Sequence, residues 1–364
     1  MAFITPLLRA GDIITSKCDI VSMNFAELSR LVAEFGEPDY RAKQIFSRLQ
    51  SGIGSFDEIT NIPKIFREKL SEKCYIARCK IKRRFESKLD DTVKYLFELN
   101  DGEFIESVLM RYRHGYTACI STQVGCNMGC KFCASGLYGK TRDLTASEMI
   151  SQITAIQADK NVRISNIVLM GMGEPLDNFD NTARFLKLVS NDEGLNIGLR
   201  HISVSTCGVV SGIEKLAALN MPVTLSVSLH APFDSIRDTI MPINKKWSIT
   251  ELIAACKKYQ SVTTRRISFE YALISGVNDS DACAKELARI LKGIMCHINL
   301  IPANPVNENS FLRPDKNRIS EFKNLLTSYG MTATVRRTLG ADIDASCGQL
   351  RRQLRKETNG ATIQ

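Results

Sequence analysis

The regular alternation of strand-like and helix-like segments in the second half of the chain restricts its fold more than any other feature. Apolar runs of strand length recur between longer segments whose apolar residues fall at helical spacing. Repeated strand–helix units form a parallel sheet, so the pattern predicts an α/β fold built as a partial or complete barrel. Strands are expected at 164–170, 201–206, 223–229, 266–274, 298–301 and 332–337, and helices at 146–160, 180–191, 211–219, 249–261, 280–294 and 318–329.

The residues that precede the barrel differ from it in the spacing of their apolar side chains. Apolar residues between 24 and 73 recur at helical spacing, which predicts a small helical domain. Strand-like runs then flank Asn100-Asp101-Gly102, a strong hairpin signal because Asp-Gly tolerates positive φ. The expected division is a loose arm (1–22), a helical accessory domain that contacts RNA (23–75), a β-hairpin extension (76–118), the barrel (119–350) and a basic tail (351–364).

The composition describes a globular protein of 364 residues, 44% of them hydrophobic, with a net charge of +9. That charge favours a polyanionic partner, and basic residues gather at 78–88 and near the C-terminus, although a solvated charged face explains such runs as often. No long apolar run or signal peptide is present, and the cysteines are mostly scattered singly. We therefore expect a cytoplasmic protein without membrane contact.

Three thiols stand in one short glycine-rich loop, at Cys126, Cys130 and Cys133. Thiolates this close can reach one soft metal centre, and no fourth cysteine follows nearby. Structural zinc sites and ordinary ferredoxin clusters use four ligands, so an incomplete set indicates chemistry at the metal. A zinc site completed by a distant residue, or a chance cluster, is the alternative.

Polar and glycine-rich clusters follow several predicted strands. Gly171-Met172-Gly173-Glu174-Pro175 follows the first, Ser205 ends the second, Ser228-Leu229-His230 ends the third, and Asn304 follows a fifth. Ligands of such barrels bind beyond the C-terminal ends of the strands. Each cluster alone is compatible with an ordinary turn, but together with the cysteine loop they predict a binding site at that end.

These residues resemble a specific family. The Cys-x3-Cys-x2-Cys loop with Phe132 resembles the radical S-adenosylmethionine (SAM) enzymes, which implies a partial (βα)6-type TIM-like barrel. With 171–175, 228–231, 241–244, 276–279 and 342–350, the chain resembles the radical-SAM adenine methyltransferases of RNA from about residue 24 to 352. Residues 301–305 and 335–337 look more like the branch that methylates carbon 2, whereas 127–129 look slightly more like the carbon 8 branch associated with antibiotic resistance.

The resemblance implies a 4Fe-4S cluster and two SAM molecules per turnover. It assigns the cluster to Cys126, Cys130 and Cys133, and SAM contacts to Gly173, Glu174, Ser205, Ser228, Leu229, His230 and Asn304.

Carbon 2 of adenine is electron-poor and cannot attack a SAM methyl group directly, so a radical route is needed. In the family mechanism Cys347 carries the methyl group, a radical formed on it links it to the adenine, Glu106 accepts the ring proton, and Cys119 releases the product as a disulfide forms.

The implied substrate is a specific adenine of 23S ribosomal RNA at the peptidyl-transferase centre, together with an adenine in the anticodon loop of transfer RNA. A flavodoxin- or ferredoxin-type electron donor and a monomeric state are also expected. A base within folded RNA must be flipped out to reach the barrel. The competing hypotheses are a radical-SAM enzyme acting on a non-RNA substrate, which gives Cys119 and Cys347 no joint role, and a zinc-bound RNA-binding module without catalysis.

Overall fold

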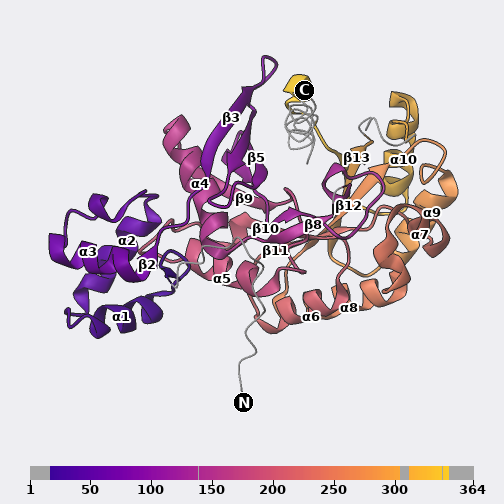
Figure 1. Ribbon diagram of the computed structural model, residues 1–364. Helices are drawn as coiled ribbons and strands as arrows, with labels where there is room; N and C mark the ends of the chain where they lie inside the picture. The colour runs from indigo at the N-terminus through magenta and orange to yellow at the C-terminus, as the bar shows by residue number, and fades with distance from the viewer. Residues whose placement is uncertain (1–16, 138, 304–310, 338, 344–364) are drawn as a thin grey trace.

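A single large sheet organises the protein (Figure 1). The computed structural model describes residues 17–137, 139–303, 311–337 and 339–343. The ten strands of the sheet lie in the order β14-β13-β12-β11-β10-β9-β6-β5-β4-β3. From β14 to β6 the neighbours are parallel, and from β6 to β3 they are antiparallel. The parallel strands are β6 (Gly115–Cys119), β9 (Ile164–Leu169), β10 (Ile202–Thr206), β11 (Thr224–Ser228), β12 (Ile267–Leu273), β13 (Cys296–Pro302) and β14 (Ala333–Val335).

Helices follow the parallel strands and cover the outside of this curved sheet (Figure 1). The predicted strands and helices of the barrel are confirmed, with ends that differ by a few residues. One expected helix, at 280–294, stops at Leu291 because Gly293 takes a left-handed conformation with φ of 82°. The helices are α4 (Ala146–Lys160), α5 (Phe179–Val189), α6 (Val210–Ala218), α7 (Asp234–Ile240), which the sequence pattern did not predict, α8 (Ile249–Thr263), α9 (Asp281–Leu291) and α10 (Lys316–Ser328).

The two capping boxes found in the sequence are formed. Thr145 caps α4 together with Glu148, and Ser248 caps α8 together with Glu251. In each box the side chain of the cap accepts from the N3 amide, while the N3 carboxylate accepts from the cap amide. These local signals therefore fix where the two longest barrel helices begin.

The predicted hairpin extends the barrel sheet. It consists of β4 (Val93–Glu98) and β5 (Phe104–Tyr112), with Gly102 at φ of 78° in the turn. A third strand, β3 (Lys80–Glu86), adds to its outer edge. One face of the hairpin packs on α4, where the Tyr95 hydroxyl donates to Asp159 at 2.9 Å. The opposite face continues the inner wall of the barrel.

The N-terminal helices form a separate lobe, seen at the left of Figure 1. It contains α1 (Phe25–Glu34), α2 (Tyr40–Gln50), the short 3-10 helix η1 (Phe56–Glu58) and α3 (Lys64–Lys73). Residues 17–22 were expected to be the end of a loose arm, but here the structure differs. Within them β1 (Cys18–Asp19) pairs in parallel with β2 (Cys74–Tyr75), and Ile20 and Val21 are buried.

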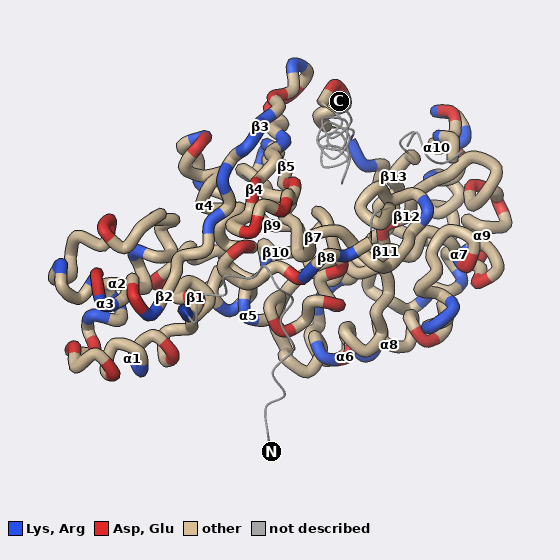
Figure 2. Tube along the Cα trace, viewed as in Figure 1, with Lys and Arg blue, Asp and Glu red and all other residues tan. Residues whose placement is uncertain are grey.

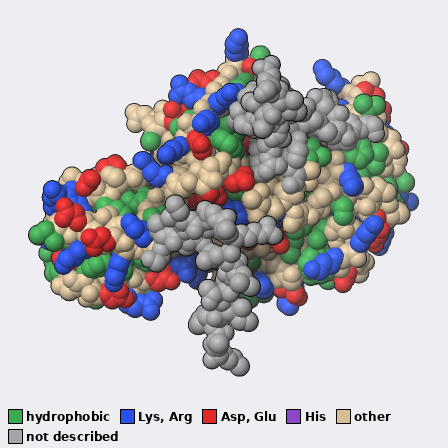
Figure 3. Space-filling view, in the orientation of Figure 1, with side chains coloured by type: hydrophobic (Ala, Val, Ile, Leu, Met, Phe, Trp, Pro, Cys, Tyr) green, Lys and Arg blue, Asp and Glu red, His purple; other side chains and the backbone are tan. Residues whose placement is uncertain are grey.

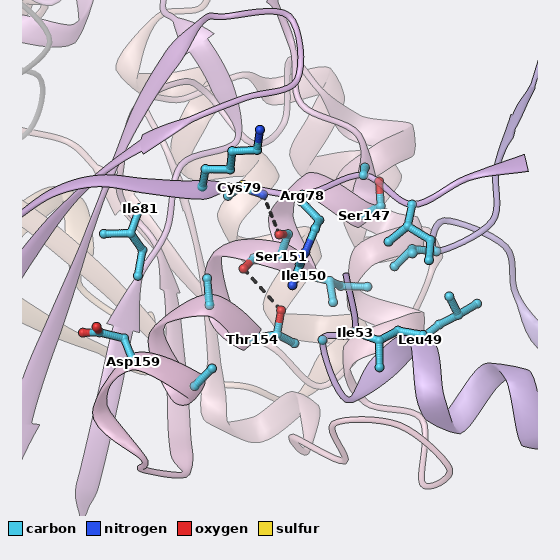
Figure 4. A pocket seen from close by; sticks show the side chains of 17 residues that line it. Leu49, Ile53, Arg78, Cys79, Ile81, Ser147, Ile150, Ser151, Thr154 and Asp159 are labelled. Atoms are coloured by element: carbon cyan, nitrogen blue, oxygen red, sulfur yellow. Dashed lines mark hydrogen bonds between the residues drawn. The ribbon is translucent and has the colours of Figure 1, made fainter. Parts of the chain in front are cut away.

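A cavity of about 510 Å³ lies between this lobe and α4 (Figure 4). Its floor is apolar, with Leu49 and Ile53 from the lobe and Ile150 from α4. The guanidinium of Arg78 lies directly over Gly54, where any Cβ would collide with it. Arg78 belongs to the basic run at 78–88, yet its side chain lies in this cavity between the lobe and the barrel.

None of the helices in the described part of the chain combines the length and the hydropathy needed to cross a lipid bilayer.

Candidate active site

The cysteine loop is the tip of a small hairpin at the C-terminal end of the barrel. Strands β7 (Gln123–Gly125) and β8 (Lys140–Asp143) pair antiparallel, and the Cys126 amide donates to the Gly139 carbonyl at 3.2 Å. Within the loop, the Cys133 amide donates to the Cys130 carbonyl at 3.1 Å. The loop is also tied to the end of α7, because the Lys131 amide donates to the Ile240 carbonyl.

The three thiols lie close enough to influence one another. Burial, with a smaller effect of the Cys133 thiol, raises the pKa of Cys126 to about 12. The pKa of Cys130 is raised by burial and by the neighbouring thiols of Cys133 and Cys126. Among the described residues, no group of three His, Cys, Asp or Glu side chains is arranged to hold a single metal ion. In a 4Fe-4S cluster each thiolate binds a different iron, and the sulfurs need not converge on one point.

The glycines after β9 allow two segments of backbone to touch. A Cβ at Gly171 would come within 2.6 Å of the Ile120 backbone, and one at Gly173 within 2.6 Å of the Gln123 side chain. Gly173 also has φ of 103°, which L side chains rarely adopt. The close approach places the 171–175 turn directly beside the strand that leads into the cysteine loop.

Glu174 is buried in this turn, and its carboxylate is already occupied. One oxygen accepts from the Leu176 amide at 3.0 Å and the other from the Cys207 amide at 2.7 Å. Burial raises the pKa of Glu174, while these hydrogen bonds lower it. The carboxylate therefore joins the ends of β9 and β10, and a ligand in this turn would meet mainly backbone.

His230 is held in one tautomer. Its Nδ1 accepts from the Ala272 amide at 2.8 Å, so the neutral ring carries its proton on Nε2. Burial lowers the pKa of His230 to about 3, and the charge of Arg237 adds to this effect. The ring meets Phe132 of the cysteine loop edge-on, with centroids 4.7 Å apart.

The other predicted SAM contacts lie at the same end of the sheet. Ser205 is the second-to-last residue of β10 and Ser228 the last residue of β11, and both are half-buried; the following residue, Leu229, is fully buried. The structure thus brings Gly173, Glu174, Ser205, Ser228, Leu229 and His230 to the edge that carries the cysteine loop. Asn304 and Cys347 lie outside the described residues.

The strand register places two predicted catalytic residues on the inner face of the sheet. In β5 and β6 Val108 is opposite Cys119, and Glu106 is two residues from Val108, so both side chains share one face. Burial raises the pKa of Cys119 to about 11; the positive charge of Arg336 lowers it, and Glu106 raises it slightly. Among the described cysteines all thiols are free, Cys119 included.

A cavity of about 460 Å³ occupies the inside of the barrel next to this face. Thr117, Val168 and Met170 line it from β6 and the β9 segment, and Asn299 and Arg336 line it from the far side. The interior of a closed barrel is normally packed with side chains. Its described lining reaches the first residues of β10 and β11, at Ser203 and Thr224, and includes neither Cys119 nor Glu106.

The comparisons with known proteins decide the family. Residues 120–285 match the model of the radical SAM superfamily, and residues 18–76 match that of the ribosomal RNA large subunit methyltransferase N-terminal domain. A curated relative from Alkaliphilus metalliredigens, described as a probable dual-specificity RNA methyltransferase RlmN, is 52% identical over 337 residues, which cover 93% of this chain and 96% of the relative. The chain belongs to the RlmN family.

Other relatives of this RlmN family member are similarly close. One from Clostridium acetobutylicum with the same description is 48% identical over 342 residues, which cover 94% of this chain and 99% of that protein. The crystal structure of a radical SAM methyltransferase from Sphaerobacter thermophilus superposes with a TM-score of 0.87 at 44% identity, and covers 91% of this chain and 98% of that one. The fold predicted from the sequence is therefore confirmed.

Membership of the radical SAM superfamily carries with it a 4Fe-4S cluster and SAM. The residues present fit both groups. Three mutually close thiols on one loop are a suitable donor set for a cluster that keeps one iron for a ligand. Next to them lie the turn at Gly173, a residue without a side chain, and His230, whose tautomer is fixed. Both offer a bound SAM molecule polar groups with defined orientations.

Sequence reasoning missed two buried residues of this RlmN family member that hold the site together. Arg237 donates to the Leu229, Ser228 and Cys207 carbonyls, and so joins the ends of β10 and β11. The Asn278 amide donates to the His230 carbonyl at 2.6 Å. Asn278 stood within a quoted motif without an assigned role, whereas nothing in the pattern around Arg237 distinguished it from a surface residue.

Proposed function

We propose that this chain methylates carbon 2 of an adenine in 23S ribosomal RNA and of an adenine in the anticodon loop of transfer RNA. The observation that carries the proposal is the extent of similarity to the dual-specificity RNA methyltransferases, about half of all residues over nearly the whole chain. The same relatives favour carbon 2 over the carbon 8 branch. A non-RNA substrate and a zinc-bound module are disfavoured by the N-terminal domain match and by the superfamily match.

We propose that one set of site residues binds the cofactors and another set transfers the methyl group. Cys126, Cys130 and Cys133 hold the cluster, and the strand-end residues with Asn304 hold SAM, of which two molecules are used per turnover. When bound, the cluster supplies the electron that cleaves SAM. Cys347 carries the methyl group to the adenine, Glu106 accepts the proton that the ring loses, and Cys119 frees the product by forming a disulfide with Cys347. Glu106 and Cys119 lie on the same inner face of the sheet, which supports the proposal that both act on the same bound adenine.

The test of this function is the position of the new methyl group. Ribosomal and transfer RNA from cells that carry only this enzyme should contain 2-methyladenine, and RNA from cells that lack it should not. Methylation at carbon 8 alone, or no methylated adenine in either RNA, would contradict the proposal. We also propose a flavodoxin- or ferredoxin-type electron donor, a monomeric state and a cytoplasmic location.

The exposed basic strand β3 is proposed to contact the RNA backbone. Figure 2 marks the positions of Lys and Arg along β3, and Figure 3 shows Lys and Arg side chains around the hairpin on this face. Part of this charge is balanced, because Arg84 pairs with Asp159 at 2.7 Å and Lys82 with Glu98 at 3.2 Å. The net effect of the run is therefore smaller than the sequence alone indicates.

Replacement of Lys80 and Lys82 together by glutamine should weaken RNA binding and flatten its salt dependence. Each phosphate contact that is lost reduces the slope of log K against log salt by about 0.7–0.9. Filter binding over a range of salt concentrations measures this slope. The matched control replaces two exposed lysines of α8, Lys257 and Lys258, with glutamine. An unchanged slope in the β3 variant would mean that the strand is only a solvated surface.

Cys119→Ala should trap the enzyme covalently on RNA, whereas Cys347→Ala should not. Cys347 forms the bond to the adenine, and Cys119 acts only afterwards, so loss of the late residue leaves the intermediate in place. A denaturing gel after turnover should show a slow, nuclease-sensitive species for Cys119→Ala alone. If only Cys347→Ala gave that species, or if neither did, the two roles would be wrongly assigned.

A further inference from the structure

Lys94 is a buried cation that the proposed mechanism does not use. It is the second residue of β4 and is almost completely buried. Its Nζ lies 3.9 Å from Oε1 of Glu106, and the two side chains are 1% and 4% exposed. This distance is an ion-pair contact but is too long for a hydrogen bond. Lys94 therefore acts on Glu106 through its charge.

The strand register produces this pair. Lys94 is opposite Val108 and Leu96 is opposite Glu106, so Lys94 and Glu106 are diagonal neighbours on one face of the hairpin. That face is the inner one, because Val108 is in turn opposite Cys119 in β6. The neighbouring residue Tyr95 points the other way, toward α4.

Stability does not explain a lysine at this position. A buried ion pair gains little over well-packed apolar residues of similar size, because both charges must leave water. The rest of β4 is apolar where it is buried, so an apolar side chain at residue 94 would suit the strand. The lysine therefore points to a task in the chemistry of its partner.

We propose that Lys94 is a positioning residue that keeps Glu106 ionised so that its carboxylate can accept the adenine ring proton. The inference rests on the proposed function. In the step concerned, the C–H bond at carbon 2 of the linked adenine breaks, its electron pair stays in the ring, and the proton joins a Glu106 oxygen. Without a nearby cation a buried carboxylate favours its neutral form, which cannot accept that proton.

Other charged or titratable groups face this pair from the adjacent elements. Two that the described structure shows are the Cys119 thiol on β6 and the Arg336 guanidinium after β14. The pKa of Cys119 is raised by burial to about 11, so this thiol is neutral near pH 7. Arg336 acts on Cys119, and Lys94 lies in ion-pair range of Glu106.

The test is the pH dependence of adduct resolution in Lys94→Met. Loss of the positive charge should raise the pKa of Glu106, so the acidic limb of the profile should move up by about one to three pH units. Near pH 7 the resolution rate should fall about 100-fold, at the lower end of what a general base contributes. The RNA-linked species should then accumulate on a denaturing gel. Lys94→Arg, which keeps the charge, should return the acidic limb of the pH profile to its wild-type position.

A double-mutant cycle separates this role from a structural one. If Lys94 acts through Glu106, adding Lys94→Met to Glu106→Gln should not slow resolution further. Lys258→Met, which removes an exposed lysine paired with Glu214, should keep the wild-type profile. If Lys94→Met does not fold, Lys94→Gln serves in the same comparison.

The outcomes are distinguishable from failure of the proposed function. If the wild-type enzyme methylates no RNA, the proposed function fails. If it does methylate RNA, an unshifted acidic limb in Lys94→Met, or additive effects of Lys94→Met and Glu106→Gln, overturns the role of Lys94.

Discussion

Replacement of Cys126, Cys130 or Cys133 by alanine is expected to abolish SAM cleavage. In the proposed cluster each thiolate binds a different iron, so the loss of any one of them removes a ligand that the other two cannot replace. Anaerobically purified wild-type protein should be brown and contain about four irons per chain. Each variant should contain clearly less iron and form no 5′-deoxyadenosine from SAM.

The matched control for these variants is Cys283→Ala. Cys283 is 2% exposed and lies on α9, away from the cysteine loop, so the change removes a buried thiol without touching the site. It should keep both the iron content and SAM cleavage. Full iron content with active SAM cleavage in any one loop variant would contradict the cluster assignment.

Arg237→Met should destabilise the barrel strongly. Arg237 is fully buried, and besides three carbonyls it binds the Asn244 side-chain oxygen at 2.9 Å. Methionine fills a similar volume but leaves these acceptors without donors, each at a cost of about 1–3 kcal/mol before relaxation. We expect the free energy of unfolding to fall by about 3–5 kcal/mol. Urea unfolding can be followed by the fluorescence of Trp247, the single tryptophan of the chain.

Arg289→Met is the control for Arg237→Met. Arg289 side-chain atoms are 70% exposed and pair with Glu286 three residues earlier on α9. Loss of such a surface pair changes stability by no more than about 1 kcal/mol. Equal unfolding midpoints for the two variants would show that the hydrogen bonds of Arg237 do not stabilise the strand ends.

The sequence by itself determined most of the barrel, because most of its strands and helices carry a local signal. Apolar periodicity changes between strand and helix along the chain, and Thr145 and Ser248 mark helix starts through contacts only three residues long. The cysteine loop is equally local, since its three cysteines lie within eight consecutive residues, 126–133. The hairpin at Asn100-Asp101-Gly102 was predictable for the same reason, because Gly102 permits the positive φ of the turn.

Strand β3 and the pairing of residues 17–22 could not be predicted in this way. Almost every side chain of β3 is exposed, so the strand has no apolar alternation and is held by its backbone pairing with β4. Strand β1 pairs with residues more than fifty positions later in the sequence. Backbone pairing over such distances leaves no periodic trace in the sequence.

Only the tertiary structure decided which chemical groups face one another. Lys94, Glu106 and Cys119 stand on three strands, and a shift of one residue in either pairing would turn one of them to the face covered by α4. Arg237, on α7, likewise has partners just beyond the ends of two strands, and no spacing in the sequence reveals them. Local patterns fix the elements because their interactions span a few residues. The register between strands is set by the packing of the whole sheet, and it is this register that assembles the inner face of the site.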